Sequence, residues 1–197
     1  MKTLMVAALA VAAVGANVAF AEEDDGIVSA APAIADPINP KQGMLAKAYQ
    51  FDCHIPAKFG ALIGQQSLAK TPAVRTYADV SGEFSKAAVP QGVLANVIRW
   101  EGFLKCKLAG TYTFTFGGWG PYSLHVNGRQ YIEAGAKQMS LDVPLKVGFN
   151  KVVIVSAFNR RNSGKLSAGY RPKDSMSDPR PLTPADLYYD KPVEAEW

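Results

Sequence analysis

Apolar and polar residues alternate along most of the chain between residues 43 and 171, and no window of a dozen residues there has the spacing of an amphipathic helix. The longest alternation runs from Ile98 to Leu108 and predicts a strand with one face in the core. Its predicted core face holds Ile98, Trp100, Leu104, Cys106 and Leu108, and its other face holds Arg99, Glu101, Phe103, Lys105 and Lys107. The body of the protein is therefore expected to be built from strands.

Further strands follow from the same period and from the turn signals between them. They are expected at 45–53, 111–116, 122–126, 129–132, 139–145, 151–158 and 166–170. Asn127-Gly128 is a strong two-residue hairpin signal, and the apolar run 151–158 suits a strand covered on both faces. Residues 54–96 give a weaker pattern, of loops with a short strand or helical turn. The sequence predicts an all-β fold, a two-sheet antiparallel β-sandwich in a single domain with extended tails.

The first part of the chain differs in composition from the body. Residues 1–21 combine Lys2, an apolar run and the small-x-small ending Ala19-Phe20-Ala21, which predicts a cleaved signal peptide. Residues 22–42 are acidic at first and then rich in Ala and Pro, and we expect them to form a solvated linker. No second apolar stretch is long enough to span a bilayer. We expect an exported protein, periplasmic or extracellular at the cell surface, without a transmembrane segment in its mature chain.

The chain contains two cysteines, Cys53 and Cys106. An even number of cysteines in an exported protein favours one disulfide. In the chain-entropy model a bridge over a loop of this length would stabilise the fold by roughly 4 kcal/mol. The alternative is that both residues are buried free thiols.

Signatures of catalysis and of metal binding are scarce. His54 and His125 are each isolated from other metal-ligating residues, and each is expected to be a lone, surface-facing histidine on a strand. The sequence has no nucleophile elbow, no phosphate-binding glycine loop and no pair of acids whose spacing would nominate them for glycoside hydrolysis. We therefore expect a protein that is not an enzyme and that uses no metal or cofactor.

Charge is divided unevenly along the chain. Residues 43–171 hold sixteen Lys and Arg against six acids, whereas 22–42 and 172–197 together hold four against eleven. This division predicts an anionic partner, such as an acidic glycan, lipopolysaccharide or an acidic protein surface. Alternatively, the acidic ends contact the basic body of the same or a neighbouring subunit, so that oligomers could form through the tails. The remaining possibility is a basic surface that only confers solubility. Nucleic acid is not expected, because no stripe of basic and aromatic residues is present.

Six short motifs occur along the chain in a fixed order. They are Gly43 to Tyr49, Trp100-Glu101-Gly102, Gly110 to Phe114, Leu124 to Gly128, Val147 to Val152, and Leu182 to Tyr188. With these motifs, residues 43–189 resemble the protective-antigen-type (PA14) domain family, whose members are β-sandwiches found in adhesins, toxins and glycosidases. The resemblance implies a recognition module, with carbohydrate as the best-known ligand. The linker at 22–42 would precede this domain, and a C-terminal tail at 190–197 would follow it.

The sequence departs from this family at the calcium site of its sugar-binding adhesins. In those members two consecutive aspartates just before the hairpin hold a calcium ion that ligates the sugar. The corresponding residues here are Trp119 and Gly120, which offer no side-chain oxygen, whereas calcium takes about six to eight oxygen ligands. Calcium-dependent binding is therefore not expected. Trp119 and Tyr122 could instead stack on a sugar ring or a partner's apolar patch, or Trp119 could pack over the end of the sandwich.

Two main functions follow from these observations, and a third, an accessory domain for a polysaccharide-degrading enzyme, would require such an enzyme as the partner. The leading hypothesis is a non-catalytic module that binds carbohydrate or an anionic surface polymer through loops at one end of the sandwich. Its expected ligand-binding residues are Trp119, Tyr122, Asn127, Arg129, Arg160, Arg161 and Asn162. The alternative is a structural subunit of a cell-envelope or surface assembly, such as a secretion apparatus or a pilus, because the unstructured ends could become ordered along a protein partner.

Overall fold

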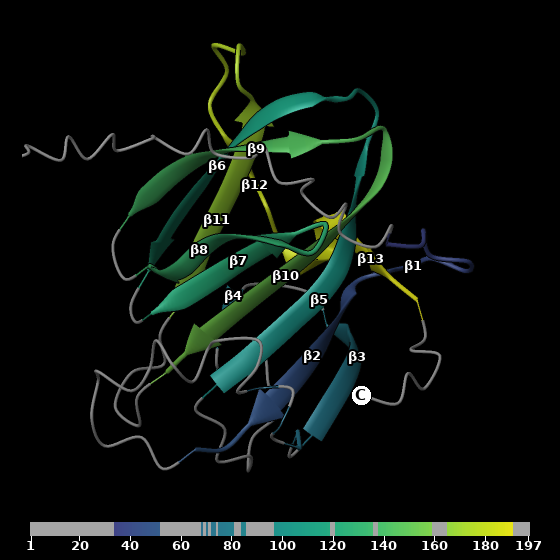
Figure 1. Ribbon diagram of the computed structural model, residues 1–197, viewed down its shortest axis with the longest axis vertical. Helices are drawn as coiled ribbons and strands as arrows, with labels where there is room; N and C mark the ends of the chain where they lie inside the picture. The colour runs from purple at the N-terminus through teal and green to yellow at the C-terminus, as the bar shows by residue number, and fades with distance from the viewer. Residues whose placement is uncertain are drawn as a thin grey trace, which may run out of the picture. The chain divides into compact units, whose positions relative to one another are not determined.

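The expected strands are present in a computed structural model of the chain, where they pair into two antiparallel sheets (Figure 1). The structure describes residues 34–51, 68, 70, 72–73, 75–80, 84–85, 97–118, 121–135, 138–158 and 165–190. The predicted signal peptide and nearly all of the predicted C-terminal tail lie outside these residues. The all-β, two-sheet fold class expected from the alternation is confirmed.

The larger sheet, sheet A, is centred on two long strands that pair along their whole length, β5 and β10. Beyond β10 lie β7 and then β8, and the other edge of β5 is shared by β2 and β13. β3 continues the sheet from β2, and β1 continues it from β13. The strands of sheet A are β1 (Lys41–Gln42), β2 (Met44–Tyr49), β3 (Arg75–Val80), β5 (Val97–Cys106), β7 (Tyr122–Val126), β8 (Arg129–Gly135), β10 (Gly148–Ala157) and β13 (Leu187–Tyr189).

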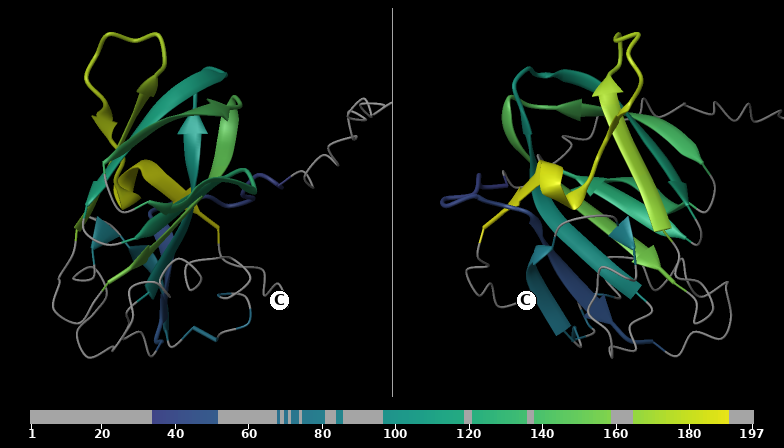
Figure 2. Two further views of the ribbon diagram at one scale, coloured as in Figure 1. Left: turned by 60° about the vertical axis from the view of Figure 1, so that its left-hand side comes forward. Right: turned by 180° about the vertical axis from the view of Figure 1, so that it is seen from behind.

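The smaller sheet, sheet B, lies behind sheet A in the view of Figure 1 and in front of it in the right-hand view of Figure 2. Its central strand β6 pairs with β9 on one side and with β11 on the other, and β12 and β4 each pair with β11. Its strands are β4 (Phe84–Ser85), β6 (Gly110–Gly118), β9 (Met139–Leu145), β11 (Lys165–Pro172) and β12 (Arg180–Pro181). A single 3-10 turn, η3 (Pro184–Asp186), leads from β12 to β13. Within the described ranges no helix has the length and apolar character needed to cross a membrane.

The apolar core lies between the two sheets. The face of β5 predicted to point inward is buried at Ile98, Trp100, Leu104 and Cys106, which confirms the alternation. Leu108 is an exception, because its side chain is 73% exposed. β5 ends at Cys106, and the chain at Leu108 has already left the sheet to cross toward sheet B.

β10 is covered on both faces, as its unbroken apolar run predicts. Val152 and Ile154 belong to the core between the sheets, whereas Val153 and Val155 belong to a second apolar cluster. The other buried members of that second cluster are Tyr49, Leu68, Val97 and Ala157. Sheet A therefore buries apolar side chains on both sides along β10.

The connections between strands divide the sandwich into two ends. At the corner end, the β5–β6 and β9–β10 connections pass from one sheet to the other, beside the pairs Cys106↔Gly148 and Gly110↔Leu145. At the loop end, β6 and β10 finish and β7 and β11 begin. Because β5 is ten residues long, the two ends lie roughly 30 Å apart. In Figure 1 the corner end is at the upper right and the loop end at the lower left.

The chain before residue 43 is attached to sheet A in its described part. The side chains of β1 are exposed, as expected of a solvated segment, but its backbone pairs with β13. The Ile38 amide donates to Asp190 Oδ2 at 2.7 Å, and Lys146 Nζ lies 3.0 Å from Asp36 Oδ1. Lys41 and Gln42 therefore find backbone partners on the edge of β13, which the composition of residues 22–42 does not indicate.

Candidate functional site

The loop end collects two of the connections in which ligand-binding residues were predicted. The Ala157 amide donates to the Pro121 carbonyl oxygen at 3.0 Å, and Leu166 pairs with Gly118. The chain ends on either side of 119–120 and of 159–164 are therefore neighbours. Trp119, Arg160, Arg161 and Asn162 themselves lie outside the described residues. Strand pairing thus brings the two connections, separated by about forty positions in sequence, to one end of the sandwich.

Buried aromatic rings, which we call the floor, pack among the strand ends from which these connections leave. Trp100 makes edge-to-face contacts with Phe84 and with Phe158, at ring-centroid distances of 5.5 and 6.1 Å. Tyr122 stacks on Phe116 at 5.6 Å. All five side chains are at most 2% exposed. Such a packed floor holds the flanking strands in fixed positions.

Tyr122 does not occupy the place predicted for it. Its side chain is fully buried at the first position of β7, where it was expected to offer a face to a ligand. β7 is buried on both faces, so the position carries an inward-facing ring although it adjoins a glycine-rich turn. We therefore assign Tyr122 to the core.

Asn127 and Arg129 lie near the other end of β7, away from the loop end. Asn127, at φ 49°, and Gly128, at φ 82°, form the predicted tight hairpin. Asn127 Oδ1 accepts from the Lys151 amide at 2.9 Å, so the Asn127 side chain holds this hairpin against β10. Arg129 is exposed, and its guanidinium lies 5.3 Å from the ring centroid of Tyr131. The predicted ligand-binding residues therefore fall into two separate groups.

Asn150 is a buried polar residue that organises the hairpin and the corner end together. Its Oδ1 accepts from Asn127 Nδ2 at 2.9 Å and from the Lys146 amide at 3.0 Å. Its Nδ2 donates to the carbonyl oxygens of Lys146 at 2.8 Å and Gly148 at 3.4 Å. The side chain is 0% exposed, so these contacts replace water at a site that water cannot reach.

Replacing Asn150 with alanine should therefore lower the free energy of unfolding by about 2 kcal/mol, because it leaves partly buried backbone groups of the β9–β10 turn without their hydrogen-bond partner. Urea unfolding monitored by fluorescence measures this difference. Ser175→Ala is a suitable control because Ser175 Oγ bonds Ser177 Oγ at an exposed site, and its expected effect is within about 0.5 kcal/mol. Equal, small effects for both variants would contradict the structural role of Asn150.

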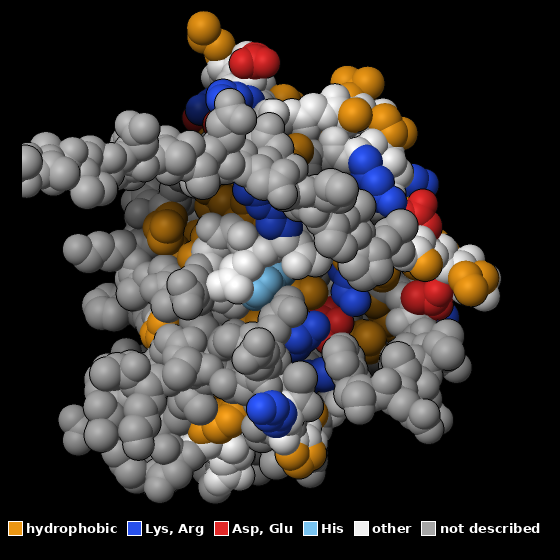
Figure 3. All heavy atoms as spheres, viewed as in Figure 1, with side chains coloured by type: hydrophobic (Ala, Val, Ile, Leu, Met, Phe, Trp, Pro, Cys, Tyr) orange, Lys and Arg blue, Asp and Glu red, His pale blue; other side chains and the backbone are white. Residues whose placement is uncertain are grey.

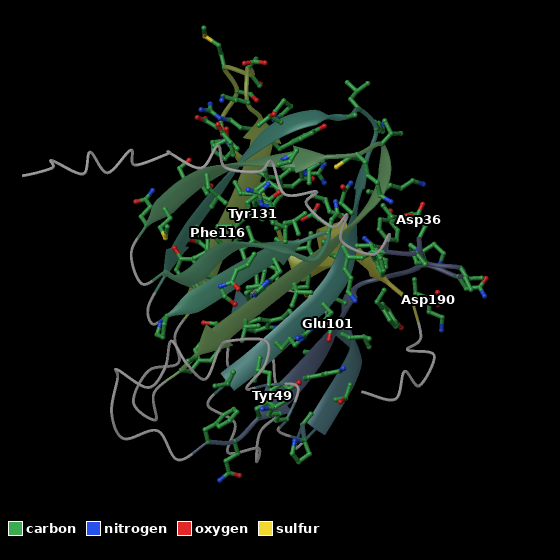
Figure 4. All side chains as sticks on the ribbon, viewed as in Figure 1. Asp36, Tyr49, Glu101, Phe116, Tyr131 and Asp190 are labelled. Carbon is green, nitrogen blue, oxygen red and sulfur yellow. The ribbon has the colours of Figure 1, made fainter. Side chains whose placement is uncertain are left out.

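A charged group that the sequence analysis did not single out lies on the outer face of sheet A. Glu101 is surrounded by Lys47 of β2, Arg99 of β5 and Lys151 of β10, and we call these four residues the Glu101 cluster. Arg99 Nε lies 2.9 Å from Glu101 Oε1, Lys47 Nζ lies 3.5 Å from the same oxygen, and Lys151 Nζ lies 3.8 Å from Oε2. Figure 3 shows basic and acidic side chains gathered over β5 and β10, where Figure 4 labels Glu101.

The Glu101 cluster is largely withdrawn from solvent. The side chains of Arg99 and Glu101 are 10% and 11% exposed, and those of Lys47 and Lys151 are 16% and 32% exposed. Burial alone would raise the pKa of Glu101, but the positive charges of Arg99, Lys47 and Lys151 together lower that pKa below its ordinary value. Glu101 is therefore held as a carboxylate. Pairing of β2, β5 and β10 creates this cluster, and only the registers of these strands could have revealed it.

His125 is buried, contrary to the expectation of a surface-facing histidine. Its side chain lies on β7 and is 3% exposed, because β7 is an interior strand between β10 and β8. Burial, and then the charge of Arg99, lower the pKa of His125 to about 4, so the imidazole is neutral near pH 7. His54 lies outside the described residues.

Cys106 carries a free, buried thiol in the structure. Burial raises the pKa of this thiol to about 11, which keeps it protonated and unreactive near neutral pH. Its proposed partner Cys53 lies outside the described residues, so the disulfide stays a prediction. In the part of the chain that the structure describes, His, Cys, Asp and Glu side chains form no group of three or more that could hold a metal ion.

The chain is similar to a known domain family and to several solved structures. Residues 40–171 match the model of the PA14 domain. The PA14 sugar-binding domain from an RTX adhesin superposes with a TM-score of 0.53 at 18% identity, covering 73% of this chain and 96% of that one. For the PA14 domain of the antifreeze protein MpAFP the TM-score is 0.57 at 14% identity, covering 80% and 95%.

A further similar structure is the epithelial adhesin 9 A domain from Candida glabrata, solved in complex with the disaccharide Galβ1-3GlcNAc. Its TM-score is 0.56 at 12% identity, covering 82% of this chain and 96% of that one. At these identities the likeness shows a common fold. Among curated proteins, none matches the sequence significantly.

Proposed function

The chain belongs to the PA14 domain family, and we propose that it is a non-catalytic recognition module that binds carbohydrate through the connections at its loop end. The resemblance seen in the sequence is confirmed by the match over residues 40–171. The observation that carries the proposal is that the described strand ends flanking 119–120 and 159–164 meet at one end of the sandwich, next to closely packed aromatic rings.

The loop end suits recognition because its support is rigid and its connections are polar or aromatic. The floor formed by Trp100 and Tyr122 with their neighbouring rings fixes the four chain ends from which the connections leave. Residues 159–164 read Asn-Arg-Arg-Asn-Ser-Gly, which supplies hydrogen-bond donors and positive charge. Trp119 supplies an aromatic face that can stack on a sugar ring. A binding site of this kind places variable chemistry on a fixed scaffold.

Structures of the same fold support a sugar as the ligand class. One is described as a sugar-binding domain of an adhesin, and another contains a bound disaccharide. In this chain Trp119 and Gly120 stand where the sugar-binding adhesins carry paired aspartates, so we propose that recognition here proceeds without calcium. Arg160, Arg161 and Asn162 would then contact hydroxyl or acidic groups of the sugar directly.

We further propose that the protein acts outside the cytoplasm, either in a periplasm or at a cell surface. The composition of residues 1–21 supports export through a signal peptide. A module of this kind would bring its host protein or cell to a glycan rather than modify the glycan. The site residues proposed here contain no pair of acids of the kind that hydrolyses glycosides.

A glycan array with the wild-type protein and two single variants tests the proposal. Trp119→Ala should weaken binding to the best glycan by about tenfold or more, because aromatic residues at the centre of a binding site carry much of its energy. Arg129→Ala should leave affinity unchanged, because Arg129 lies near the opposite end of β7. Addition of a calcium chelator should also change nothing.

Other outcomes would contradict specific parts of this proposal. Chelator-sensitive binding would contradict the calcium-independent mode, and equal losses for Trp119→Ala and Arg129→Ala would contradict the choice of the loop end. Absence of binding to every glycan, together with a stable protein partner from the native source, would favour an envelope-assembly subunit instead.

A further inference from the structure

The two connections of the corner end lie side by side although nearly forty residues separate them in sequence. β5 pairs with β10 up to Cys106↔Gly148, and β6 pairs with β9 up to Gly110↔Leu145. Both connections therefore link the β5–β10 pair of sheet A to the β6–β9 pair of sheet B. Figures 1 and 2 show the teal and green bends next to each other in different views.

Each of the two connections exposes a lysine that is followed directly by an aliphatic residue. In the first, Lys107 is followed by Leu108, whose side chain is 73% exposed. In the second, Lys146 is followed by Val147, whose side chain is 60% exposed. Leu108 and Val147 are two of the five large apolar side chains of the described residues that are exposed. We call Lys107, Leu108, Lys146 and Val147 the corner tips.

The corner tips are held in place by hydrogen bonds to the body of the sandwich. Tyr112 Oη donates to the Leu108 carbonyl oxygen at 3.0 Å. Buried Asn150 bonds both the amide and the carbonyl oxygen of Lys146, and Gly148 takes the positive φ of 89° that closes the turn. The exposed Leu and Val side chains therefore stand on a fixed base, which reduces the entropy lost when they are buried against a partner.

Positive charge surrounds the two apolar side chains. Lys107 and Lys146 precede them directly, and Lys105 lies close by with its Nζ 5.4 Å from the ring centroid of Phe149. Asp36 pairs with Lys146 at 3.0 Å across exposed atoms. Among the described residues named here, three lysines stand against one acid, so the surface around Leu108 and Val147 is basic. Met176 is also exposed, but Asp174 and Asp178 flank it, so it is not part of the basic surface.

We propose that the corner tips form a docking surface for a lipid membrane with anionic headgroups. Leu108 and Val147 would enter the boundary between headgroups and acyl chains, and the lysines would contact headgroup phosphates. Two exposed side chains are a small apolar feature, whereas a stable protein interface buries about 800 Å² on each partner. A deformable, negatively charged layer fits such a feature better than a protein pocket does.

Docking at the corner end would orient the whole domain. The loop end lies at the opposite end of the ten-residue strand β5, roughly 30 Å from the membrane surface. The proposed carbohydrate site would then face away from the lipid. The membrane proposal rests on the corner tips alone and does not require that the loop end bind a sugar.

Vesicle co-sedimentation tests this inference with the chain that starts at Glu22, the exported form expected from the sequence. We expect the wild-type protein to bind vesicles of phosphatidylcholine with phosphatidylglycerol and to bind pure phosphatidylcholine vesicles weakly. The double variant Leu108→Ser with Val147→Ser should reduce the partition coefficient by about a hundredfold, since burying each side chain contributes about a factor of ten. Lys107→Gln with Lys146→Gln should reduce binding to anionic vesicles by about tenfold or more.

Met139→Ser is the matched control, because Met139 is 37% exposed and pairs with Phe116 near the loop end. It should bind vesicles like the wild type, and thermal unfolding should show that all variants are folded. No binding of the wild type to anionic vesicles would overturn the proposal, as would an equal loss for Met139→Ser. A change from dimer to monomer in the Leu108/Val147 variant, seen by light scattering, would also overturn it and assign the corner tips to self-association.

Discussion

Replacing Trp100 with alanine is expected to lower the free energy of unfolding by about 3–5 kcal/mol. Trp100 is 0% exposed and contacts Phe84 and Phe158 edge to face, so the substitution opens a large cavity beneath the loop end. Its indole Nε1 has no hydrogen-bond partner among the described residues. Removing that unsatisfied donor offsets a small part of the loss. Urea unfolding of the variant and the wild type measures the difference.

Trp100→Phe separates the cavity from the loss of the indole itself. Phenylalanine keeps most of the aromatic volume and carries no unsatisfied N–H, so a loss below about 1.5 kcal/mol is expected. A loss in Trp100→Ala no larger than that of an exposed substitution such as Met176→Ala would contradict the placement of Trp100 at the centre of the floor. The two variants together also show whether glycan binding at the loop end depends on this support.

The sheet faces could be predicted from the sequence wherever one side of a strand is buried and the other is not. The alternation over residues 98–106 correctly identified Trp100 and Cys106 as core residues, since a one-residue shift would have moved every side chain to the opposite face. The Asn127-Gly128 turn was equally clear, because both residues adopt positive φ that other residue types avoid. Local patterns of this kind depend on few residues and little on the rest of the fold.

Positions at the ends of strands were predicted less well. Leu108 continues the alternation of β5 but lies beyond the point where the strand ends, so it is exposed. Tyr122 follows a glycine-rich turn but already belongs to β7, so it is buried. Whether such a residue is buried depends on where strand pairing stops, and that is decided by the partner strands.

The candidate site could be predicted only in part, because its geometry depends on pairings that are distant in sequence. Trp119 and Arg129 are ten positions apart and were grouped together, yet β7 separates the two connections on which they lie. Strand pairing brings the described ends that flank 119–120 and 159–164 to one end of the sandwich, and the part of these two connections in ligand binding stays a prediction. The Glu101 cluster was missed because its members come from three strands whose registers the sequence does not state.

Replacing Glu101 with glutamine is expected to lower the free energy of unfolding by about 3 kcal/mol. The substitution preserves the shape of the side chain but leaves Arg99, Lys47 and Lys151 without the carboxylate that they share. The matched control is Asp142→Asn, which removes a carboxylate that pairs with Lys173 at 2.8 Å. Because both partners of that pair are exposed, its loss should be clearly smaller. Equal losses would show that the Glu101 cluster contributes no more than a surface ion pair.

The pH dependence of stability distinguishes Glu101 from the neighbouring His125. Burial and the charge of Arg99 lower the pKa of His125 from 6.5 to about 4. Between these values only the unfolded chain binds the proton, so stability falls as the pH drops from about 6.5 to about 4.

Burial alone would raise the pKa of Glu101, but the surrounding cations lower that pKa below 4.5. The stability that the Glu101 carboxylate contributes is therefore present above pH 4.5 and is lost as the pH falls through the folded pKa. Urea unfolding from about pH 8 to about pH 3 should therefore show both losses in the wild type. Glu101→Gln should retain the His125 loss and lack the loss at lower pH, whereas parallel curves below the ordinary pKa of Glu101 would contradict its role as the shared carboxylate.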